Sequence, residues 1–377
     1  MDISRSVNNL MQSGPLLREA TMVKNVRVLA SLLGPAFRGF IKQCAKKHEQ
    51  TELAVVYNAN FNWHYRREFP EMTRLYEAAK TAQWNVSKDI DWSQDVDPQK
   101  ETLLPDEFVP SSSLPLWEKM NDKERAEQRY AVLSWLLSQF LHGEQGALYA
   151  SAQVIEAVPW LDAKLYGSTQ VVDEGRHVEA FHRYLTEKLN KLYEINDNLY
   201  VVIDTLMTDS RWDIKFLGMQ IMIEGLALGA FGTIRQITSD PLLKEILKYV
   251  IKDEARHVHY GVLALEVFYK QLPETERRDR EDLAFELSLL LRNRFLMHEV
   301  YDEYYSHKMK RSDWDKLILD SRLLNLFRQT MFRRVIPNLK RIGLLSSRIR
   351  PYYEDIGLLV YEHGKAAPEL TVDELLK

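Results

Sequence analysis

The sequence predicts an all-α protein whose core is a four-helix bundle, with additional helices at its N- and C-terminal ends. Three observations support this fold class. The chain has 15 Gly and 13 Pro in 377 residues and few stretches in which apolar and polar residues alternate, which favours helices over strands. Two segments in the middle of the chain repeat one pattern of Glu and His residues, and each segment contains a proline near its midpoint.

The repeated pattern is a lone Glu followed by a Glu-x-x-His motif, at the same spacing in both segments. All three positions recur at one common offset along the chain, as Glu144, Glu174 and His177 and then as Glu224, Glu254 and His257. Four carboxylates and two imidazoles are the protein ligands of a pair of iron ions, and helix bundles supply them as one Glu from each of two helices and a Glu-x-x-His from each of the other two. The six residues are therefore predicted to bind a metal pair.

A single Glu-x-x-His motif carries little weight, because composition alone should produce about one in a chain of this length. Glu179 and His182 form such a motif, and it fails the repeat test because Glu and His do not recur at the common offset. It also lies five residues along from Glu174 and His177, which is roughly 140° around a helix of 3.6 residues per turn. We therefore expect Glu179 and His182 to point away from the metal ligands.

The two prolines divide each segment into a helical hairpin. Pro159 lies halfway between Glu144 and Glu174, and Pro241 lies close to the midpoint of Glu224 and Glu254. A proline inside a helical run breaks it, and a proline at the first position of a helix is favourable. Each arm then has about 15 residues, or roughly 22 Å at 1.5 Å per residue, so the ligands on the two arms return to the same height. Two such hairpins packed face to face bring all six ligands to one level.

The whole chain, residues 1–377, is predicted to form a single domain. Residues 1–120 are expected to contain helices and extended chain, residues 121–272 the four-helix core, and residues 273–377 further helices and a polar tail. The stretch 84–115 is rich in Asp, Ser and Pro and should wrap the core as an extended loop. The core helices are predicted at 123–157, 160–190, 212–238 and 241–271, with a short connection before 212 and outer helices at 22–47, 278–307 and 313–336.

The residues beside each motif repeat as well. Asp173 and Asp253 precede the ligand Glu residues, and Arg176 and Arg256 precede the ligand His residues. A metal-bound His usually donates its second ring N–H to a carboxylate or carbonyl group. We favour this role for the two Asp residues, each acting on the His of the opposite hairpin, and the alternative is an Asp–Arg pair at the surface.

The sequence around Glu224 predicts that this carboxylate is buried. Residues 216–223 and 225–231 carry no charge, and an ionised Glu in such surroundings is costly unless a cation pairs with it. A metal ligand satisfies this condition. A protonated or arginine-paired core carboxylate is the alternative.

Composition and motifs exclude several other classes of function. A net charge of −4 and a pI near 6.2 give no electrostatic case for nucleic-acid binding. The single cysteine, Cys44, excludes an intrachain disulfide and suits a reducing cytoplasm. No apolar run approaches the roughly 20 residues of a membrane span, and residues 1–5 do not resemble the start of a signal peptide. We therefore expect a cytoplasmic protein without membrane contact. Because there is no nucleotide-binding fingerprint, electrons for redox chemistry must come from outside the chain.

The doubled Asp-Glu-x-Arg-His motif with its upstream Glu resembles the ferritin-like di-iron carboxylate superfamily over about residues 123–271. The chain is most similar to hydroxylase subunits of bacterial multicomponent monooxygenases. It resembles ribonucleotide reductase small subunits and di-iron N-oxygenases more loosely. Trp84-Asn85 and residues 90–93 also resemble the segment that precedes the first ligand helix in this superfamily.

This resemblance implies a pair of irons bridged by Glu174 and Glu254. Glu144 and His177 would complete one iron site, and Glu224 and His257 would complete the other. A mixed Mn/Fe pair is compatible with hard carboxylate ligands. Such a centre, once reduced, activates O₂ and oxidises an organic substrate or a protein residue. We expect a homodimer that acts on a small, largely apolar substrate by hydroxylation, N-oxygenation, desaturation or C–C cleavage, with a ferredoxin or reductase as electron donor.

Two positions depart from the patterns of the related families. Reductase small subunits that store a tyrosyl radical carry Tyr four residues after the first ligand His, where this chain has Phe181. The N-oxygenases add a third His four residues before the second motif's Glu, where this chain has Val250. A radical-generating or self-modifying oxidase and a non-catalytic iron-binding protein are the alternatives to an oxygenase.

Overall fold

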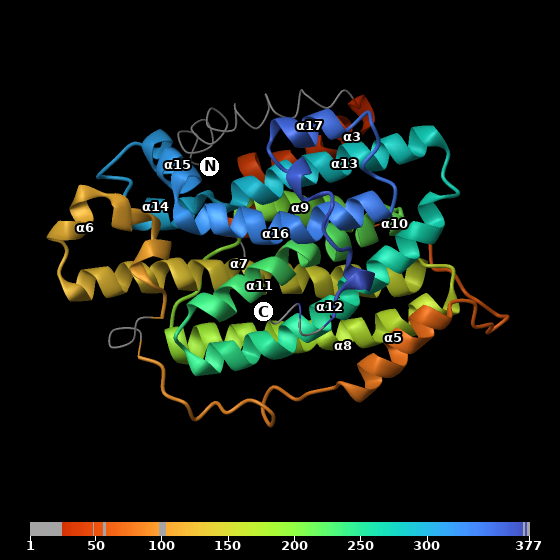
Figure 1. The fold of residues 1–377 in the computed structure, drawn as a ribbon, viewed down its shortest axis with the longest axis horizontal. Helices are drawn as coiled ribbons and strands as arrows, with labels where there is room; N and C mark the ends of the chain where they lie inside the picture. Colours follow the sequence, from red (N-terminus) through yellow and green to blue (C-terminus); the bar gives the residue numbers. More distant parts are fainter. Residues whose placement is uncertain (1–24, 48, 56–57, 98–102, 372–373, 375–377) are drawn as a thin grey trace.

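The computed structural model describes residues 25–47, 49–55, 58–97, 103–371 and 374. All regular elements in these ranges are helices, so the predicted all-α class is confirmed. Figure 1 shows them lying side by side in an elongated bundle. The predictions for residues 22–24, for 98–102 and for most of the last six residues lie outside the described residues.

The four predicted core helices are present and form two hairpins. They are α7 (Asp122–Ala157), α8 (Leu161–Arg183), the continuous run of α10 (Trp212–Lys215), η5 (Phe216–Ile223) and α11 (Glu224–Ile237), and α12 (Pro241–Tyr269). α7 packs along α8 and α11 packs along α12, while α8 contacts α12 and α7 contacts η5, so the four arms close into a bundle (Figure 1).

Local hydrogen bonds fix where the long helices begin. Asn121 caps α7: its side-chain oxygen accepts from the N–H of Glu124 at 3.0 Å, and the Glu124 carboxylate accepts from the N–H of Asn121 at 2.8 Å. Asp240 caps α12 by accepting from the N–H groups of Leu242 and Leu243 at 2.9 and 3.2 Å. Because these ends are fixed, the ligand positions are held at set heights along the bundle.

The second hairpin differs from the first in one backbone feature. η5 is a π-helix that ends immediately before Glu224, whereas α7 is α-helical throughout. π-Helical turns are rare and often lie at functional sites. This departure from the regular helix was not predicted from the sequence.

Three predictions about the outer segments are wrong. The expected short connection over 190–212 contains a buried helix, α9 (Asp197–Thr208). The expected helix 278–307 is divided into α13 (Glu274–Asn293), η6 (Arg294–Leu296) and α14 (His298–Tyr304). The expected helix 313–336 is divided into α15 (Arg311–Asp320) and α16 (Arg322–Arg341).

Each of these errors has a local cause. β-Branched residues at 201–203 lower the helix propensity of α9, which is stabilised instead by burial against α7 and α13. Met297, with φ of 51°, ends η6 in the left-handed region that non-glycine residues seldom adopt. Ser321 has extended backbone and caps α16 by accepting from the N–H of Leu324.

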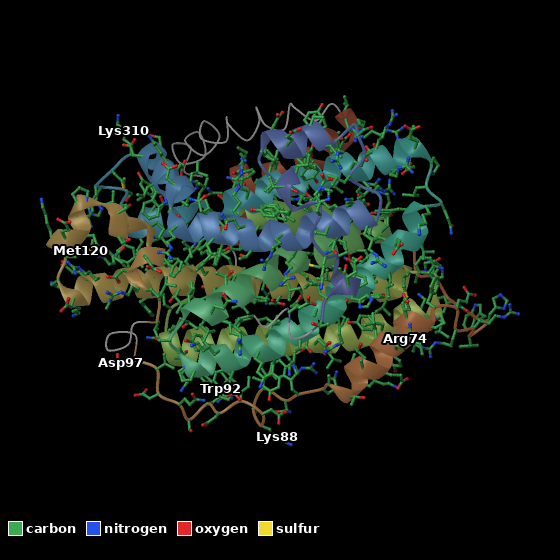
Figure 2. All side chains as sticks on the ribbon, viewed as in Figure 1. Arg74, Lys88, Trp92, Asp97, Met120 and Lys310 are labelled. Carbon is green, nitrogen blue, oxygen red and sulfur yellow. The ribbon has the colours of Figure 1, made fainter. Side chains whose placement is uncertain are left out.

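The loop between the N-terminal region and the core runs along the outside of α8, as predicted (Figures 1 and 2). It follows α5 (Pro70–Thr81), which packs on α8 and α12. Lys188 fastens it by donating to the carbonyls of Trp92 and Gln94, both at 2.8 Å. Its end carries three short helices, η2 (Asp106–Phe108), η3 (Pro110–Ser113) and α6 (Pro115–Lys119).

The remaining elements cover the bundle. α3 (Val26–Ala36) and η1 (Phe37–Lys42) pack on α9, and α4 (Cys44–Lys47) follows them. η4 (Tyr184–Leu189) continues α8. α17 (Arg350–Asp355), η7 (Leu359–Tyr361) and η8 (Ala367–Glu369) lie near the C-terminal end. The described part of the tail is attached rather than free, because Ala367 is buried and its N–H donates to Asn338 Oδ1 at 2.8 Å.

One helical run, Trp212–Ile237, is long and apolar enough to cross a membrane by length and composition, which the sequence analysis did not anticipate. Its most apolar window is entirely buried inside the protein. The apolar character of this run therefore reflects its place in the core, where it carries Glu224.

Candidate metal centre

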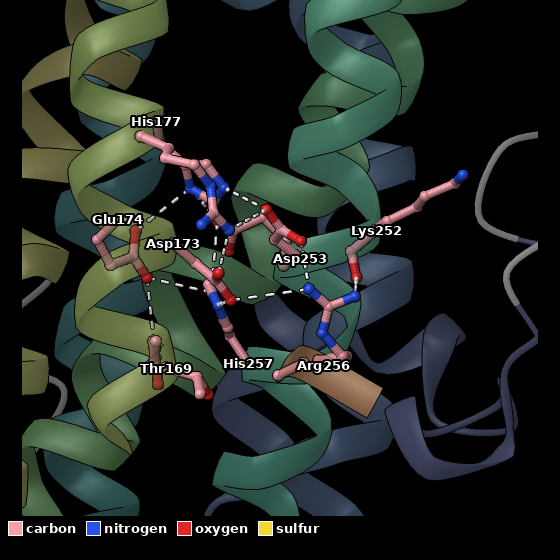
Figure 3. Close-up of polar contacts among 12 residues, drawn as sticks. Thr169, Asp173, Glu174, His177, Lys252, Asp253, Arg256 and His257 are labelled. Carbon is pink, nitrogen blue, oxygen red and sulfur yellow. Dashed lines mark hydrogen bonds and ion pairs between the residues drawn. The ribbon is translucent and has the colours of Figure 1, made fainter. Parts of the chain in front are cut away.

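The structure brings all six predicted ligands together in the middle of the four-helix core. Each of the six is buried, with an exposed fraction of at most 5%. Figure 3 shows Glu174 and His177 on α8 facing His257 on α12. Glu144 comes from α7 and Glu224 from the start of α11. The arrangement matches the two hairpins predicted from the sequence.

The ligand atoms form two adjoining groups that share one residue. Glu144, Glu174, His177 and Glu254 each offer an atom within 4.8 Å of the others, and so do Glu174, Glu224 and His257. His177 Nδ1 lies 3.2 Å from Glu144 Oε2 and 3.1 Å from Glu254 Oε1.

The second imidazole has equivalent neighbours. His257 Nδ1 lies 3.1 Å from Glu174 Oε1 and 3.6 Å from Glu254 Oε1. Donors that bind one ion at about 2.1 Å in adjacent positions lie roughly 3 Å apart. The spacing around both imidazoles is therefore that of ligands to metal ions, with Glu174 and Glu254 between the two His residues.

Several of these ligand atoms are buried without a hydrogen-bond partner among the described residues. They are Glu174 Oε2, Glu224 Oε2, both carboxylate oxygens of Glu254, and His257 Nδ1. A buried polar atom left unpaired costs about 1–3 kcal/mol, and more when it is charged. Five such atoms in one cluster are satisfied together by cations, so the residues present fit a metal pair.

The outer nitrogens of the imidazoles are held across the two hairpins. His177 Nε2 lies 3.2 Å from Asp253 Oδ2, and His257 Nε2 lies 3.2 Å from Asp173 Oδ2 (Figure 3). These are the cross-hairpin contacts expected from the sequence. With Nε2–H donating to an Asp, each ring presents an unprotonated Nδ1 to the centre.

The alternative contact, an Asp–Arg pair, is present at the same Asp residues. Arg176 donates to Asp173, and Arg256 donates to Asp253. The two roles therefore do not exclude each other. However, the pairs are not at the surface, because both Asp side chains are buried.

Burial and mutual repulsion dominate the electrostatics of the cluster. Burial and the charge of Glu254 raise the pKa of Glu144 well above its usual range, and burial and Glu174 do the same for the pKa of Glu224. Burial also opposes ionisation of Glu174, but the two imidazoles outweigh it and lower its pKa. The closely spaced carboxylates therefore favour bound positive charge.

Two glutamines that the sequence analysis missed lie at the cluster, one in direct contact with the ligands and the other supporting it. The side-chain amide of Gln170 donates to Glu174 Oε1 at 3.1 Å and to Glu224 Oε1 at 2.9 Å, and Gln220 donates to Gln170 Oε1 at 3.4 Å. Gln170 and Gln220 each lie four residues before a ligand Glu, on the same helix face. That spacing was the signal in the sequence that could have identified them.

The loop before the core also reaches the site. Trp84 Nε1 donates to Asp253 Oδ2 at 2.7 Å, and the Trp84 ring stacks on half-buried Tyr249 with ring centres 4.9 Å apart. A continuous chain of contacts thus leads from His177 through Asp253 and Trp84 to Tyr249. The resemblance around Trp84 drew attention to this segment, but the sequence did not predict the contact.

The positions that the sequence analysis set aside lie away from the cluster. Glu179 and His182 are both exposed, as the helix-face argument predicted. Phe181 is buried in an aromatic group with Phe140 and Phe231, at ring-centre distances of 6.4 and 5.6 Å.

No protein-family model and no curated protein matches the chain. Among solved structures it is similar to R2-like ligand-binding oxidases. One, a mutant with an anaerobically reconstituted Mn/Fe cofactor, is 20% identical, with 75% of this chain and 96% of that chain covered and a TM-score of 0.46. Another, from Sulfolobus acidocaldarius, is 17% identical, with 72% and 93% covered and a TM-score of 0.43. These similarities are distant, and the six candidate ligands are assigned from the geometry of this chain.

Proposed function

We propose that this chain is a non-haem oxidase or oxygenase that holds two metal ions, either Fe/Fe or Mn/Fe, and uses O₂ to oxidise a small organic substrate. Glu144, Glu174, His177 and Glu254 would hold one ion, and Glu174, Glu224 and His257 would hold the other. The observation that carries the proposal is the set of buried, unpaired ligand atoms that converge from four helices. A mainly carboxylate and imidazole ligand set suits iron or manganese, whereas thiolates would suit zinc or clusters.

When bound and reduced, such a metal pair supplies electrons to O₂. The protein supplies the surroundings for this chemistry. Asp173 and Asp253 fix the orientation and tautomer of the two imidazoles. Gln170 holds Glu174 and Glu224 through one side-chain amide. The buried walls exclude bulk water from the cluster.

Electrons have to enter from outside, because the sequence has no nucleotide fingerprint of its own. The contacts from Tyr249 through Trp84 and Asp253 to His177 give a connected path from a half-buried ring to the centre. We assign this path to electron entry from a ferredoxin or reductase. Replacement of Trp84 by Leu should slow reduction by the donor and leave metal content unchanged.

An anaerobic titration of metal-free protein with Fe(II), followed by mixing with O₂, tests the proposal. Binding of two Fe(II) per chain and rapid O₂ consumption would support it. No binding would reject it. Binding without O₂ consumption, with and without a panel of small apolar substrates, would instead indicate a non-catalytic iron-binding protein.

The same experiment separates an oxygenase from a radical-generating or self-modifying oxidase. A stable radical signal in electron paramagnetic resonance, or a single turnover that changes the mass of the chain, would favour the second class. Substrate-coupled O₂ consumption over many turnovers would favour the first. Homodimer formation and a cytoplasmic location remain predictions, and sedimentation analysis tests the former.

A further inference from the structure

A small cavity borders the metal centre. Its wall includes Glu144 and Glu224, the apolar side chains of Phe140 and Ile223, and the guanidinium-bearing residue Arg294. The centre of a water molecule can occupy about 10 Å³ in this cavity, so the cavity holds roughly one water. The cavity therefore connects an arginine with two of the candidate metal ligands.

Arg294 is buried without a partner. It is 1% exposed, and within the described part of the chain its guanidinium makes no hydrogen bond or ion pair. It lies over the ring of Phe295, with Cζ 4.7 Å from the ring centre. Burial alone lowers the pKa of Arg294 to about 10, so the side chain keeps its positive charge at neutral pH.

The other buried cations among the described residues are paired, unlike Arg294. Arg280 Nε donates to Asp213 Oδ2 at 2.9 Å, and Lys215 donates to the backbone carbonyl of Leu206 at 3.0 Å. A buried charge is normally paired or bound to a counter-ion, because an isolated charge is costly in a low-dielectric interior. A buried, unpaired guanidinium that lines a cavity is therefore a site for an anion.

We propose that Arg294 anchors the carboxylate of an organic acid, which is the substrate class of the metal centre. The planar guanidinium fork matches a carboxylate in two parallel hydrogen bonds. The hydrocarbon part of the acid then lies among Phe140, Ile223 and Ala227, beside Glu144 and Glu224. The link to oxidation rests on the proposed function, whereas the anchoring of the acid rests on Arg294 and the cavity.

An acid of several carbons needs more room than one water. Gly143, Ala147 and Ala227 lie in the wall of the cavity, so part of the wall is made of small side chains. Met297, in the left-handed region just after η6, places a break in the helix next to Arg294. We expect binding of the acid to displace the side chains beside this break.

The test is a calorimetric titration of the full-length protein loaded with Mn(II), with hexanoate and with its uncharged isostere hexanamide at pH 7. We expect wild-type protein to bind hexanoate at least tenfold more tightly than hexanamide. Arg294→Gln should weaken hexanoate at least tenfold and leave hexanamide unchanged, and Arg294→Lys should retain part of the preference. Arg292→Gln, two residues away and half-buried, is the matched control and should behave as wild type.

A thermal shift gives an independent readout of the same site. Arg294→Met removes an unpaired buried charge, so its unfolding temperature should be at or above that of wild type. Hexanoate should raise the unfolding temperature of wild type and have no effect on the variant. A folded Arg294→Met variant also shows that lost hexanoate binding is not caused by unfolding.

Two outcomes would overturn the proposal: no preference for hexanoate in wild type, or equal hexanoate affinity in wild type and Arg294→Gln. In the second case, loss of bound Mn(II) from Arg294→Gln would show that Arg294 balances the charge of the centre. Failure of the proposed function is a separate result, because it appears as missing metal or O₂ consumption while discrimination between hexanoate and hexanamide persists.

Discussion

The two hairpins of the core carry the same ligands at the same spacing, yet their surroundings differ. One turn before the ligand Glu residues, the first hairpin has Phe140 and Gln170, and the second has Gln220 and Val250. Gln170 donates to Glu224, and Gln220 donates to Gln170; Glu224 also directly follows the π-helix η5. The candidate ligands are duplicated, but the side chains that support them are not, so the surroundings of the two ligand groups are not equivalent.

The hairpins also differ in how they are covered. At equivalent positions in the repeat, Tyr149 on α7 is 55% exposed, whereas Gly229 on α11 lies against the backbone of Thr330 on α16. α16 packs along α11, and α13 packs on η5. The second hairpin is therefore an interior element, and the first is partly an outer wall.

The largest expected effect concerns the candidate ligands that the two hairpins contribute to one cluster. Glu174→Ala or His257→Ala should abolish binding of the metal pair, because each removes a ligand atom that lies among those of the other hairpin. Metal content after Fe(II) loading and desalting measures this. We expect about two ions per wild-type chain, as in two-metal sites of this type, and none in the variants.

The control for this prediction is the second Glu-x-x-His motif of α8. Glu179→Ala and His182→Ala are exposed changes and should leave metal content unchanged. Equal loss of metal in these variants would show that the helix-face argument, and with it the assignment of the ligands, is wrong.

The next prediction uses an unpaired carboxylate on the helix that covers the second hairpin. Glu286 on α13 is buried with both oxygens unpaired among the described residues, and burial followed by the charge of Asp282 raises its pKa from 4.5 to about 8. A group with a raised pKa in the folded state stabilises the protein at low pH and loses that contribution as pH rises through the folded pKa. At 1.4 kcal/mol per pKa unit, the rise from 4.5 to about 8 amounts to roughly 5 kcal/mol over the full titration.

Glu286→Gln should therefore remove the loss of stability that accompanies the ionisation of Glu286 as pH rises. Urea unfolding of wild type and variant at pH 5 and pH 8 measures it, since the titration of the metal cluster is common to both proteins. From pH 5 to pH 8, the free energy of unfolding of the variant should rise relative to that of wild type by up to roughly 4 kcal/mol. Glu274→Gln, an exposed change on the same helix, should show no such shift. Parallel pH profiles for wild type and Glu286→Gln would contradict the prediction.

Gly229→Ala tests whether the second hairpin is more tightly packed against its covering helices than the first. A Cβ at this position would lie 2.5 Å from the carbonyl oxygen of Thr330, which is backbone and cannot rotate away. Overpacking of this kind costs about 1–3 kcal/mol, and the free energy of unfolding should fall by that amount. Tyr149→Ala, at the equivalent place in the first hairpin, should change it by less than about 1 kcal/mol. Similar losses in the two variants would show that both hairpins are equally enclosed.

The repeat allowed the core to be predicted because it combines several constraints in one pattern. The common offset of Glu, Glu and His identified the ligands, and Pro159 and Pro241 marked the turns. The ends of α7, of α8 with η4, of the run from α10 to α11, and of α12 were therefore placed within a few residues. Arg294 and Trp84 could not be found in this way. They reach the site from segments outside the repeat, and only tertiary packing brings them there.

The outer helices were predicted less well for a related reason. α9 is helical because it is buried, although its β-branched residues favour other structure. The break at Met297 has no glycine or proline to mark it. Gln170 and Gln220 were predictable only in part. Their spacing from the ligand Glu residues is visible in the sequence, but glutamine is common on helices, so the spacing alone does not single them out.

The smallest effect concerns the inequivalence of the two metal sites. Gln170→Leu removes the amide that holds Glu174 and Glu224 but leaves all six ligands in place. Loss of such a supporting contact usually costs 10–100-fold in metal affinity, and we expect about tenfold in the binding step that involves Glu224 and His257. Mn(II) titration followed by electron paramagnetic resonance resolves the two steps. Val250→Ala, at the equivalent position on α12, should leave both affinities unchanged. Equal weakening of both steps in Gln170→Leu would mean that the metals are bound as one unit, and the difference in support between the hairpins would then have no consequence for metal binding.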